Sequence, residues 1–389
     1  MAAVSALPLT QKALKVASPD TLHLVTDAPL PTLGQDDSVL IRVVCVAINP
    51  VDGKSAEMSP TPGATSGTDF AGIVVALRTN SEHKPDGRAD TIKTGDRVMG
   101  FVFGNNPHVL GNGAFAEYVT LPRRFLWRVP DHMSLEAAAS LPVGIASVGM
   151  ALHYLHISMP SLLEAMSRSI AAPSASHDHD GASDGDANVF ILVYGGGTST
   201  GAIAIQILKA AGFTPITCCS SESASRAKRL GAAATFDYQS ATCGRDIREY
   251  TNDSLALAID CLSESASMAI CYEAIGSAGG RYVSLDPFPI RGCVRRSIVP
   301  DWICSFTQFG HSINWAPPYN LDERPDDYRL AEEWYHLAQK LLDAQLIEAP
   351  TLELRSGGLL RVPEGVTAVK LGQIKRRKLV YHVSEEVLP

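Results

Sequence analysis

A glycine-rich segment in the middle of the chain has the residue types that bind a dinucleotide. Residues 188–194 form an apolar run typical of a strand, and residues 202–212 carry apolar side chains at helical spacing. Backbone N–H groups at the start of such a helix are free to bind a pyrophosphate. We therefore predict that cofactor phosphates contact the turn between these elements. It consists of Gly195, Gly196, Gly197, Thr198, Ser199, Thr200 and Gly201.

The spacing of these glycines is not the commonest one. The turn reads Gly-Gly-Gly-x-x-x-Gly, whereas the usual dinucleotide motif reads Gly-x-Gly-x-x-Gly. By itself, the segment is also compatible with an ordinary connection between a strand and a helix. The next strand-like run, residues 213–219, favours the dinucleotide interpretation because it supplies the second strand of a nucleotide-binding unit.

The residues after that second strand bear on the choice between NAD and NADP. A carboxylate here accepts from the ribose 2′-hydroxyl but repels a 2′-phosphate. Ser220 and Ser221 stand at this point, and Arg226 and Lys228 follow one helical turn later. Hydroxyl donors and nearby cations favour NADPH, although Glu222 opposes it if its side chain turns inward. We predict NADPH, with Ser220, Ser221 and Arg226 as ligands.

The pattern of strand-like and helical segments changes near residue 149. Before it, short strand-like runs alternate with glycine and proline, which predicts a compact β-rich domain. After it, strands and helices alternate, which predicts a doubly wound parallel sheet, so the fold class is α/β. The strand-like runs of the first part are 38–46, 71–77, 96–100 and 114–119.

Helical and polar segments complete this organisation. Residues 137–155 are expected to be helical, and a polar insertion at 170–187 has too little apolar surface to fold, so we expect it to be flexible. The His-Asp-His-Asp run at 177–180 is better explained as a solvated loop than as a metal site, because adjacent side chains diverge along an extended segment. Residues 327–346 predict an amphipathic helix, and 378–383 a strand that returns to the first domain.

Composition excludes several classes of protein. The chain has 389 residues, of which 46% are hydrophobic and 19% charged, so it can bury the cores of two domains. The formal net charge of −8 argues against nucleic acid as a partner. The sequence has neither a signal-peptide pattern nor an apolar stretch long enough for a membrane, so we expect a cytoplasmic protein whose eight cysteines are mostly buried and reduced.

Together, these segments resemble the medium-chain dehydrogenase/reductase superfamily over almost the whole chain. The chain looks most similar to the trans-acting enoyl reductases that serve fungal polyketide synthases. The resemblance rests on the order and spacing of AINPVDGK (47–54), GTDFAGIV (67–74), KTGDRV (93–98), GAFAEY (113–118), LPVG (141–144) and YGGGTSTG (194–201).

The resemblance implies a GroES-like catalytic domain and a Rossmann cofactor domain. The boundaries that we expect are 1–148 with 349–389 for the catalytic domain, and 149–348 for the NADPH-binding domain. Zinc-dependent members hold their metal with a cysteine, a Gly-His-Glu segment and a further ligand. Here Thr68 and Asp69 stand at the Gly-His-Glu position, so a tetrahedral site is not available from these residues. Without zinc, reduction of an activated C=C bond fits better than alcohol oxidation, and we expect no metal.

The resemblance also implies site residues in the first domain. Val51, Asp52, Gly53 and Lys54 would border the nicotinamide, and Lys54 is the first candidate for an electrostatic or proton-donating role, although it is equally explained as a solvated surface lysine. Ser147 is the second catalytic candidate, with a helix cap or packing role as the alternative. The substrate-lining stretch comprises Leu141, Pro142, Val143, Gly144, Ile145, Ala146, Ser147 and Val148.

Further matched positions are less specific. Tyr238 resembles a tyrosine that flanks the adenine, although it is equally compatible with a core position. Trp302 and Phe306 are expected either to line an apolar substrate channel or to pack in the core. The remaining expected cofactor contacts are Leu285 and Asp286, at the end of a strand, and Leu379 and Val380, near the carboxyl terminus.

Three functions fit these residues. The first is a trans-acting enoyl reductase that takes its substrate from the acyl carrier protein of a polyketide synthase, or of a hybrid of such a synthase with a peptide synthetase. The second is a free-standing NADPH quinone or enone reductase, and the third is an NADPH-binding scaffold without turnover. We favour the first. We also expect a monomer, because Pro300 and neighbouring arginines lie where an edge strand must avoid pairing.

Overall fold

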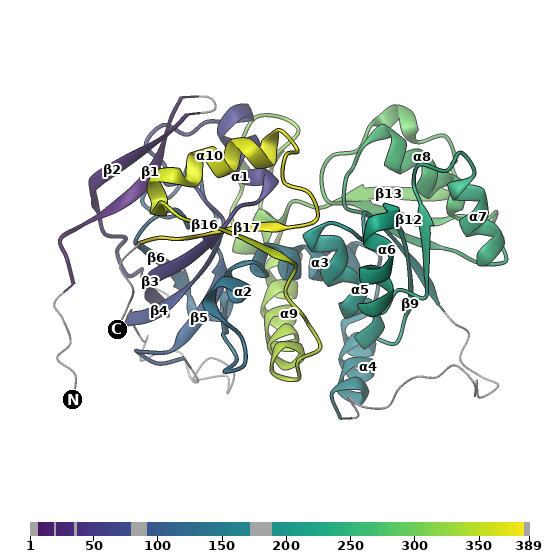
Figure 1. Ribbon diagram of the computed structural model, residues 1–389, viewed down its shortest axis with the longest axis horizontal. Helices are drawn as coiled ribbons and strands as arrows, with labels where there is room; N and C mark the ends of the chain where they lie inside the picture. The colour runs from purple at the N-terminus through teal and green to yellow at the C-terminus, as the bar shows by residue number, and fades with distance from the viewer. Residues whose placement is uncertain (1–6, 19–20, 35–36, 79–91, 172–188, 385–389) are drawn as a thin grey trace. The chain divides into compact units, whose positions relative to one another are not determined.

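The computed structural model describes residues 7–18, 21–34, 37–78, 92–171 and 189–384. The chain divides into two compact units, coloured in sequence order in Figure 1. The first unit comprises the described parts of Met1–Val143, Phe306–Tyr335 and Thr351–Pro389, and the second those of Gly144–Ser305 and His336–Pro350. No helix of the described ranges is long and apolar enough to cross a membrane.

The first unit is rich in β-strands, as its strand-like runs predicted, and its strands pair in antiparallel fashion except for β16 with β17. A seven-stranded sheet has the order β16-β17-β3-β4-β5-β7, with β6 paired to β3, and two two-stranded sheets join β1 to β2 and β14 to β15. The strands are β1 (Thr10–Ser18), β2 (Thr21–Pro29), β3 (Ser38–Ala47), β4 (Asp69–Leu77), β5 (Arg97–Phe101), β6 (Tyr118–Pro122), β7 (Leu126–Arg128), β14 (Ile313–Asn314), β15 (Asn320–Leu321), β16 (Leu352–Arg355) and β17 (Lys378–His382).

The carboxyl-terminal strand returns to the first unit, as expected. β17 pairs with β3 in antiparallel register, so that His382 lies opposite Cys45. The helices of this unit are α1 (Pro50–Met58), α2 (Leu135–Ala139), α10 (Gly358–Lys370), most of α9 (Pro325–Asp343) and the 3₁₀ turns η1 (Arg123–Phe125) and η3 (Ser305–Phe309). α1 packs on α10, where Gly53 comes so close to Val366 that an added Cβ would lie 3.2 Å from its side chain.

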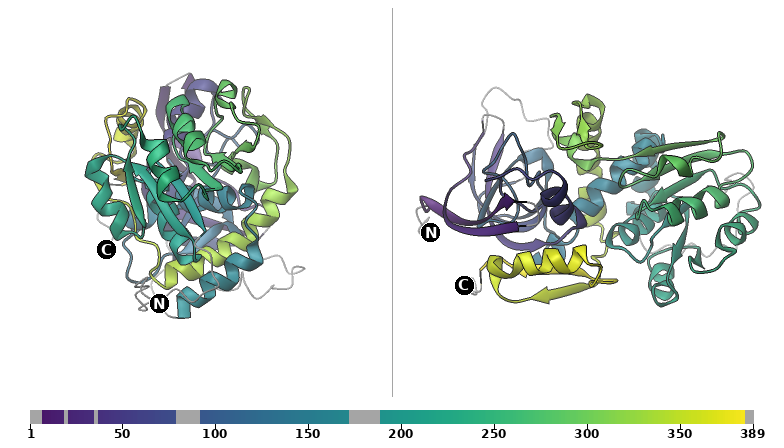
Figure 2. Two further views of the ribbon diagram at one scale, coloured as in Figure 1. Left: turned by 90° about the vertical axis from the view of Figure 1, so that its right-hand side faces the viewer. Right: turned by 90° about the horizontal axis from the view of Figure 1, so that it is seen from above.

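The second unit contains a parallel sheet of six strands in the order β10-β9-β8-β11-β12-β13. The strands are β8 (Phe190–Tyr194), β9 (Thr214–Cys219), β10 (Ala234–Asp237), β11 (Leu257–Asp260), β12 (Gly280–Ser284) and β13 (Ile298–Trp302). Its helices are α3 (Pro142–Tyr154), α4 (Met159–Ala171), α5 (Ser199–Ala210), α6 (Ser221–Arg229), α7 (Cys243–Tyr250) and α8 (Ser265–Ala274), with the turn η2 (Ile290–Gly292). Helices lie on both sides of the sheet (Figure 2), which is the doubly wound arrangement that the sequence predicted.

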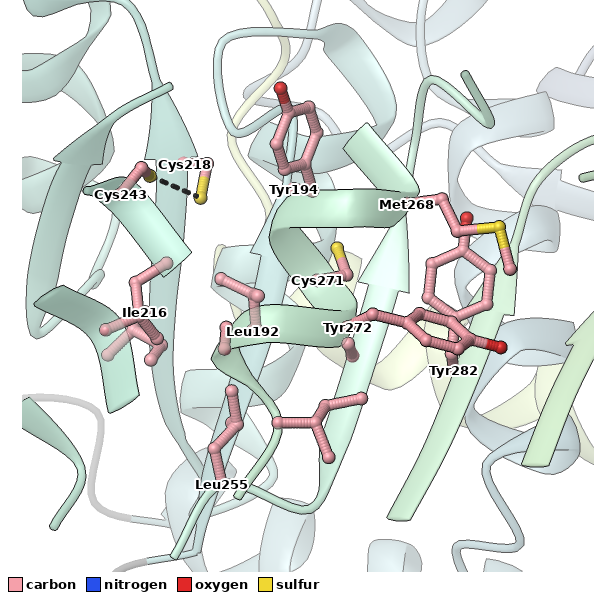
Figure 3. Packing of buried hydrophobic residues seen from close by; sticks show 14 of the residues in the cluster. Leu192, Tyr194, Ile216, Cys218, Cys243, Leu255, Met268, Cys271, Tyr272 and Tyr282 are labelled. Carbon is pink, nitrogen blue, oxygen red and sulfur yellow. Dashed lines mark hydrogen bonds between the residues drawn. The ribbon is translucent and has the colours of Figure 1, made fainter. Parts of the chain in front are cut away.

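One core of the second unit lies between the sheet and α7 and α8. Leu192, Ile216 and Tyr282 of the strands pack there against Met268 and Tyr272 (Figure 3). The rings of Tyr272 and Tyr282 meet edge to face, with centroids 5.6 Å apart. Burial of these apolar and aromatic side chains is the main force that holds the two helices on the sheet.

The cysteines are free thiols, and six of the eight are buried. The sulfurs of Cys218 and Cys243 approach to 3.7 Å in the core of the second unit (Figure 3). Cys261 is partly exposed and Cys293 is exposed. The cysteines are thus mostly buried, as the sequence predicted.

The expected domain boundaries, after residues 148 and 348, fall after residues 143 and 350 in the structure, and one internal segment changes unit. Residues 306–335 belong to the first unit, although the sequence analysis assigned them to the cofactor domain. The reason is aromatic packing: Phe306 and Phe309 each lie 5.2 Å from Phe101 between ring centroids, and Tyr335 stacks on Trp127 at 4.0 Å. The first unit therefore recruits a segment that is distant in the sequence.

The expected helix at 137–155 is divided into two. α2 ends at Ala139 and α3 begins at Pro142, because proline lacks the N–H that a continuous helix would use and fits best at a helix start. Of the expected insertion at 170–187, Ile170 and Ala171 belong to α4, and the rest, with its His-Asp-His-Asp run, lies outside the described residues.

Candidate active site

The glycine-rich turn connects β8 to α5 in the second unit and has the shape of a phosphate cradle. Thr198 caps α5: its hydroxyl accepts from the N–H of Gly201 at 2.9 Å and donates to the carbonyl of Gly195 at 2.8 Å. Gly195 has a φ of +90°, a conformation that favours glycine. The cap fixes the turn while leaving the other first-turn N–H groups of α5 available for an anion.

Three glycines of this turn have no room for a side chain. A Cβ on Gly196 would lie 2.2 Å from the hydroxyl of Thr217, and one on Gly201 would lie 2.2 Å from the carbonyl of Gly195. A Cβ on Gly197 would come within 2.6 Å of the hydroxyl of Ser223. At Gly201 the helix start therefore lies directly against the backbone of the turn, as a dinucleotide turn requires, and these residues fit a pyrophosphate.

The tip of β9 carries the residues expected at the ribose. Ser220 precedes α6, and its hydroxyl lies 3.3 Å from that of Ser223. Ser221 is exposed in the first turn. Arg226 is half-buried one turn later, where its guanidinium donates to the carbonyl of Ala349 at 3.3 Å. Burial lowers the pKa of Arg226 from its ordinary value.

Tyr238 follows β10 at the same edge of the sheet. β10 pairs in parallel with β9, with Asp237 opposite Cys219, so Tyr238 and Ser220 each follow the last residue of neighbouring strands. Its side chain is 42% exposed, which is more than a core position allows, and its ring centroid lies 6.4 Å from that of Tyr194. An exposed aromatic ring at this edge is suited to stacking on a flat base.

Asp260 organises the neighbouring loop at the end of β11, and it is not among the residues predicted from the sequence. Its buried carboxylate accepts from the N–H groups of Leu262 and Ser263 at 2.9 and 3.0 Å, and from the hydroxyls of Ser267 and Tyr282 at 2.6 and 2.7 Å. The signal was an aspartate that ends an apolar strand, Leu-Ala-Ile-Asp, at the edge where parallel sheets bind ligands.

The expected pair Leu285 and Asp286 is held next to this loop. The N–H of Leu285 donates to the carbonyl of Asp260 at 3.1 Å, and the hydroxyl of Ser284 donates to the carbonyl of Asp286 at 2.7 Å. The carboxyl ends of β8, β9, β11 and β12 thus place the glycine turn, the serine tip and residues 285–286 along one edge.

In the first unit, a buried polar network surrounds the start of α1. The side-chain amide of Asn49 donates to Thr68 at 3.1 Å and to Asp69 at 2.7 Å, while the ammonium of Lys378 bonds to Asn49 and lies 3.0 Å from Asp69. Asp52 accepts from the N–H of Asn49 at 2.7 Å and from the hydroxyl of Thr68 at 2.9 Å. The network therefore joins α1, β4 and β17.

Burial controls the electrostatics of this network. It raises the pKa of Asp52 to about 7, because the bonds from Asn49 and Thr68 and the charge of Lys378 only partly offset desolvation. Burial also raises the pKa of Asp69, against the opposing charge of Lys378 and the bonds from Asn49 and from the N–H of Val143. The ammonium of Lys378 thus faces Asp69. Asp69, like Thr68, stands where zinc-dependent dehydrogenases carry the Gly-His-Glu segment.

Comparisons with known proteins agree with this architecture. Residues 35–131 match the family model "Alcohol dehydrogenase GroES-like domain", and residues 199–285 match "Zinc-binding dehydrogenase". The chain is 90% identical to the trans-enoyl reductase tenC of Beauveria bassiana over all of both chains. It is 68% identical to the trans-enoyl reductase fumoC of Cordyceps fumosorosea, over 99% of this chain and 96% of that one. The chain belongs to the trans-enoyl reductase family.

Solved structures support the fold at much lower identity. An alcohol dehydrogenase superfamily protein from Novosphingobium aromaticivorans is 21% identical, with a TM-score of 0.70 over 96% of this chain and 100% of that one. A quinone oxidoreductase from Coxiella burnetii is 20% identical, with a TM-score of 0.63 over 96% of this chain and 99% of that one. These likenesses confirm the expected pairing of a GroES-like domain with a Rossmann domain.

In this member of the trans-enoyl reductase family, the expected catalytic residues lie on well-packed elements. Lys54 is exposed on α1, while Val51 is partly exposed and Asp52 and Gly53 are buried. Ser147 lies in α3, where its hydroxyl is 2.9 Å from that of Ser305. The carboxylate of Asp52 is engaged at both oxygens, so in this structure it holds α1 in place.

The expected substrate and carboxyl-terminal residues are mostly buried. Of residues 141–148, Val143 alone is partly exposed, and its N–H donates to Asp69 at 2.8 Å. Leu379 and Val380 are buried in β17, and the carbonyl of Leu379 accepts from Ile48 at 2.9 Å. Trp302 is partly exposed in β13, and Phe306 is buried in η3.

The first unit also contains a pocket of about 450 Å³, which the sequence did not indicate. Phe103, Phe125, Phe309 and Tyr328 contribute to its lining, and Arg124 lies over Phe125 and Tyr328. Its aromatic residues come from segments about 200 positions apart in the sequence, so only the folded chain brings them together.

Proposed function

We propose that this protein transfers hydride from NADPH to the β-carbon of an α,β-unsaturated polyketide thioester held on the acyl carrier protein of a partner polyketide synthase, in secondary metabolism. As a trans-enoyl reductase, it is an oxidoreductase that acts with a partner synthase. The observation that carries the proposal is 90% identity over the full length to a trans-enoyl reductase, together with a glycine turn built for a dinucleotide.

The reaction asks the protein chiefly to position its reactants and to stabilise charge. NADPH, when bound, supplies the hydride. As the β-carbon accepts it, negative charge moves to the thioester oxygen and the α-carbon takes up a proton. The protein must hold the alkene in place and direct donors at that oxygen. Lys54, exposed on a helix that the buried network anchors, is the donor that we assign, and the hydroxyl of Ser147 is the second.

The cofactor assignment rests on the turn and on the tip of β9. Gly195 to Gly201 would hold the pyrophosphate, and Tyr238 would stack on the adenine, with residues 285–286 on the nicotinamide side. Ser220 and Ser221 would donate to the 2′-phosphate, and Arg226 supplies a cation one turn away. Val51, Leu379 and Val380 complete the set of cofactor contacts that we propose.

Nucleotide titration tests the choice of NADPH. The protein should bind NADPH at least about tenfold more tightly than NADH, which corresponds to one or two donor contacts to the phosphate. Ser220→Asp should reverse this preference because a carboxylate repels the 2′-phosphate, whereas Ser240→Asp, beyond β10, should not. Equal affinities for the two nucleotides in the wild-type protein would refute the assignment.

The substrate is proposed to contact the stretch Leu141 to Val148, with Trp302 and Phe306 as further apolar contacts. A matched comparison of substrates tests the carrier: the same enoyl group on an acyl carrier protein and on a short soluble thiol. We expect faster NADPH oxidation with the carrier-bound form and poor turnover of quinones. Faster turnover of quinones than of any enoyl thioester would favour a free-standing quinone reductase, which at present has only the shared fold in its support.

We also propose that the protein is a monomer. β13 is an edge of the parallel sheet, and Pro300 in its middle lacks the N–H that pairing with another strand would use. Light scattering coupled to gel filtration should give the mass of a single chain, and a stable dimer would contradict this assignment.

A further inference from the structure

Three side chains with metal-ligand chemistry meet on the first unit, and none of them is assigned above to hydride transfer. Cys45 comes from β3, Glu136 from α2 and His382 from β17. One donor atom of each lies within 4.8 Å of a donor atom of each of the others. Residues so far apart in the sequence gave no spacing from which a site was predictable.

The backbone fixes two of the three side chains. Cys45 and His382 are direct partners across the antiparallel strands β3 and β17, so their side chains leave the same face of the sheet. The sulfur of Cys45 lies 3.7 Å from Nδ1 of His382, and Nε2 of His382 lies 3.1 Å from the carboxylate of Glu136. Glu136 is in the first turn of α2, which Ser134 caps.

From this geometry we propose that Cys45, Glu136 and His382 form a binding site for one Zn²⁺ or a similar borderline-soft divalent cation. A thiolate, an imidazole and a carboxylate are the three ligand types that zinc accepts, whereas Mg²⁺ and Ca²⁺ prefer oxygen alone. Donor atoms around tetrahedral zinc lie roughly 3.3 to 3.6 Å apart, whereas those of the three residues lie within 4.8 Å of one another. The thiol lies at Nδ1 of His382 and the carboxylate at Nε2, so the imidazole must turn until one of its nitrogens faces the ion together with the other two ligands.

Accessibility and charge fit such an ion. The side chain of His382 is 46% exposed and that of Glu136 is 25% exposed, so an ion has a path from solvent and a water can take the fourth position. Thiolate and carboxylate together carry two negative charges, which Zn²⁺ neutralises as the thiol releases its proton. The bound ion would clamp the carboxyl-terminal strand to β3 and α2.

Cys45, His382 and Glu136 also resemble the order of a nucleophile, a base and an orienting carboxylate. The surroundings of the sulfur do not activate it as a nucleophile. Burial, and then the charge of Glu136, raise the pKa of Cys45 to about 12, so the ion-free sulfur is a thiol and not the thiolate that reacts.

The site differs from the catalytic zinc position of the related dehydrogenases. That position corresponds to the segment with Thr68 and Asp69, which here is occupied by the network of Asn49, Asp52 and Lys378. The proposal concerns other residues and does not depend on the assigned reaction. Its test therefore uses neither NADPH nor an enoyl substrate.

Cobalt titration of the untagged, chelator-treated full-length protein tests the site. We expect one equivalent of Co²⁺ to produce a thiolate-to-cobalt charge-transfer band that Zn²⁺ abolishes by displacement. Cys45→Ser should eliminate the band, and His382→Gln and Glu136→Gln should each weaken binding by about tenfold or more. Circular dichroism checks that each variant folds. If Cys45→Ser does not fold, the cobalt affinities of His382→Gln and Glu136→Gln decide whether the site exists.

Two matched controls make the outcome specific. Cys293→Ser removes an exposed thiol, and His177→Ala with His179→Ala removes the histidines of the polar insertion, so both proteins should keep the band. The proposal is overturned if the wild-type protein gives no band. It is equally overturned if the band survives in Cys45→Ser, His382→Gln and Glu136→Gln, or disappears in either control.

Discussion

At the scale of single residues, the assignment of Lys54 predicts a split between chemistry and binding. Lys54→Ala removes a donor that acts on the developing enolate, so kcat should fall by about tenfold to a hundredfold or more. The dissociation constant for NADPH should change less than about threefold, because the phosphate turn is untouched. Lys12→Ala, at an exposed lysine of β1, serves as the control. Wild-type turnover in Lys54→Ala would remove this residue from the mechanism.

Asp52 predicts an unusual dependence of stability on pH. Its pKa is raised to about 7 in the folded protein, against about 3.9 in the unfolded chain. Between these values the folded protein keeps a proton that the unfolded chain has lost. The free energy of unfolding should therefore fall as the pH rises from about 4 to 7, with a contribution from this residue on the order of 4 kcal/mol.

Denaturant unfolding at several pH values measures this contribution. Asp52→Asn keeps the shape of the side chain without the charge, so its stability should decline less between pH 4 and 7 than that of the wild-type protein. Asp131→Asn, at an exposed carboxylate, should behave as the wild type. Parallel pH profiles for Asp52→Asn and wild type would show that Asp52 is not protonated in the fold.

The sequence predicted which residues form the candidate site better than it predicted the hydrogen-bond partners of those residues. It predicted Gly195 to Gly201 and Ser220 because neighbouring residues in the chain define a turn and a strand tip. It took Asp52 as a cofactor neighbour and Thr68 with Asp69 only as replacements for zinc ligands. Their common network depends on Lys378, more than 300 positions away, whose burial no local pattern reveals.

At the scale of elements, the connection between β8 and α5 depends on Gly201. A Cβ there would lie 2.2 Å from the carbonyl of Gly195, so Gly201→Ala must push the helix away from the turn. We expect at least about a tenfold loss in NADPH affinity, because the N–H groups no longer converge on the pyrophosphate. Gly111→Ala, where the added Cβ has no neighbour within 4 Å, is the matched control. Unchanged NADPH affinity in Gly201→Ala would contradict the cradle.

The buried pair of Lys378 and Asp69 should be important for joining β17 to β4. Lys378→Met leaves Asp69 buried and uncompensated, which should cost about 3 to 5 kcal/mol in the free energy of unfolding. Adding Asp69→Asn should restore part of this loss. The more exposed pair Lys370 and Glu57 provides the comparison, and Lys370→Met should cost less than about 1 kcal/mol. Equal effects of the two lysine substitutions would mean that burial does not matter.

Element types were more predictable than the units to which elements belong. The helix expected at 327–346 is α9, and the strand expected at 378–383 is β17, because periodicity is local information. The sequence placed residues 306–335 in the cofactor domain, yet their aromatic side chains complete the core of the first unit. Membership of a unit is decided by packing between distant segments, which periodicity does not contain.

At the scale of the whole molecule, family membership and fold agree with a reductase that works beside a synthase. The identity of 90% extends over the entire chain of a trans-enoyl reductase. The match therefore includes the regions that would contact the carrier protein and the substrate as well as the cofactor turn. The reaction must therefore be tested with the synthase present.

Reconstitution of a candidate partner synthase with malonyl building blocks and NADPH, with and without this protein, tests the central claim most directly. The account predicts that the product gains two hydrogens per reduced double bond only when the protein is added, as read by mass spectrometry. The gain should be much smaller with Lys54→Ala. A product with the same degree of saturation in the presence and absence of the protein would contradict the account.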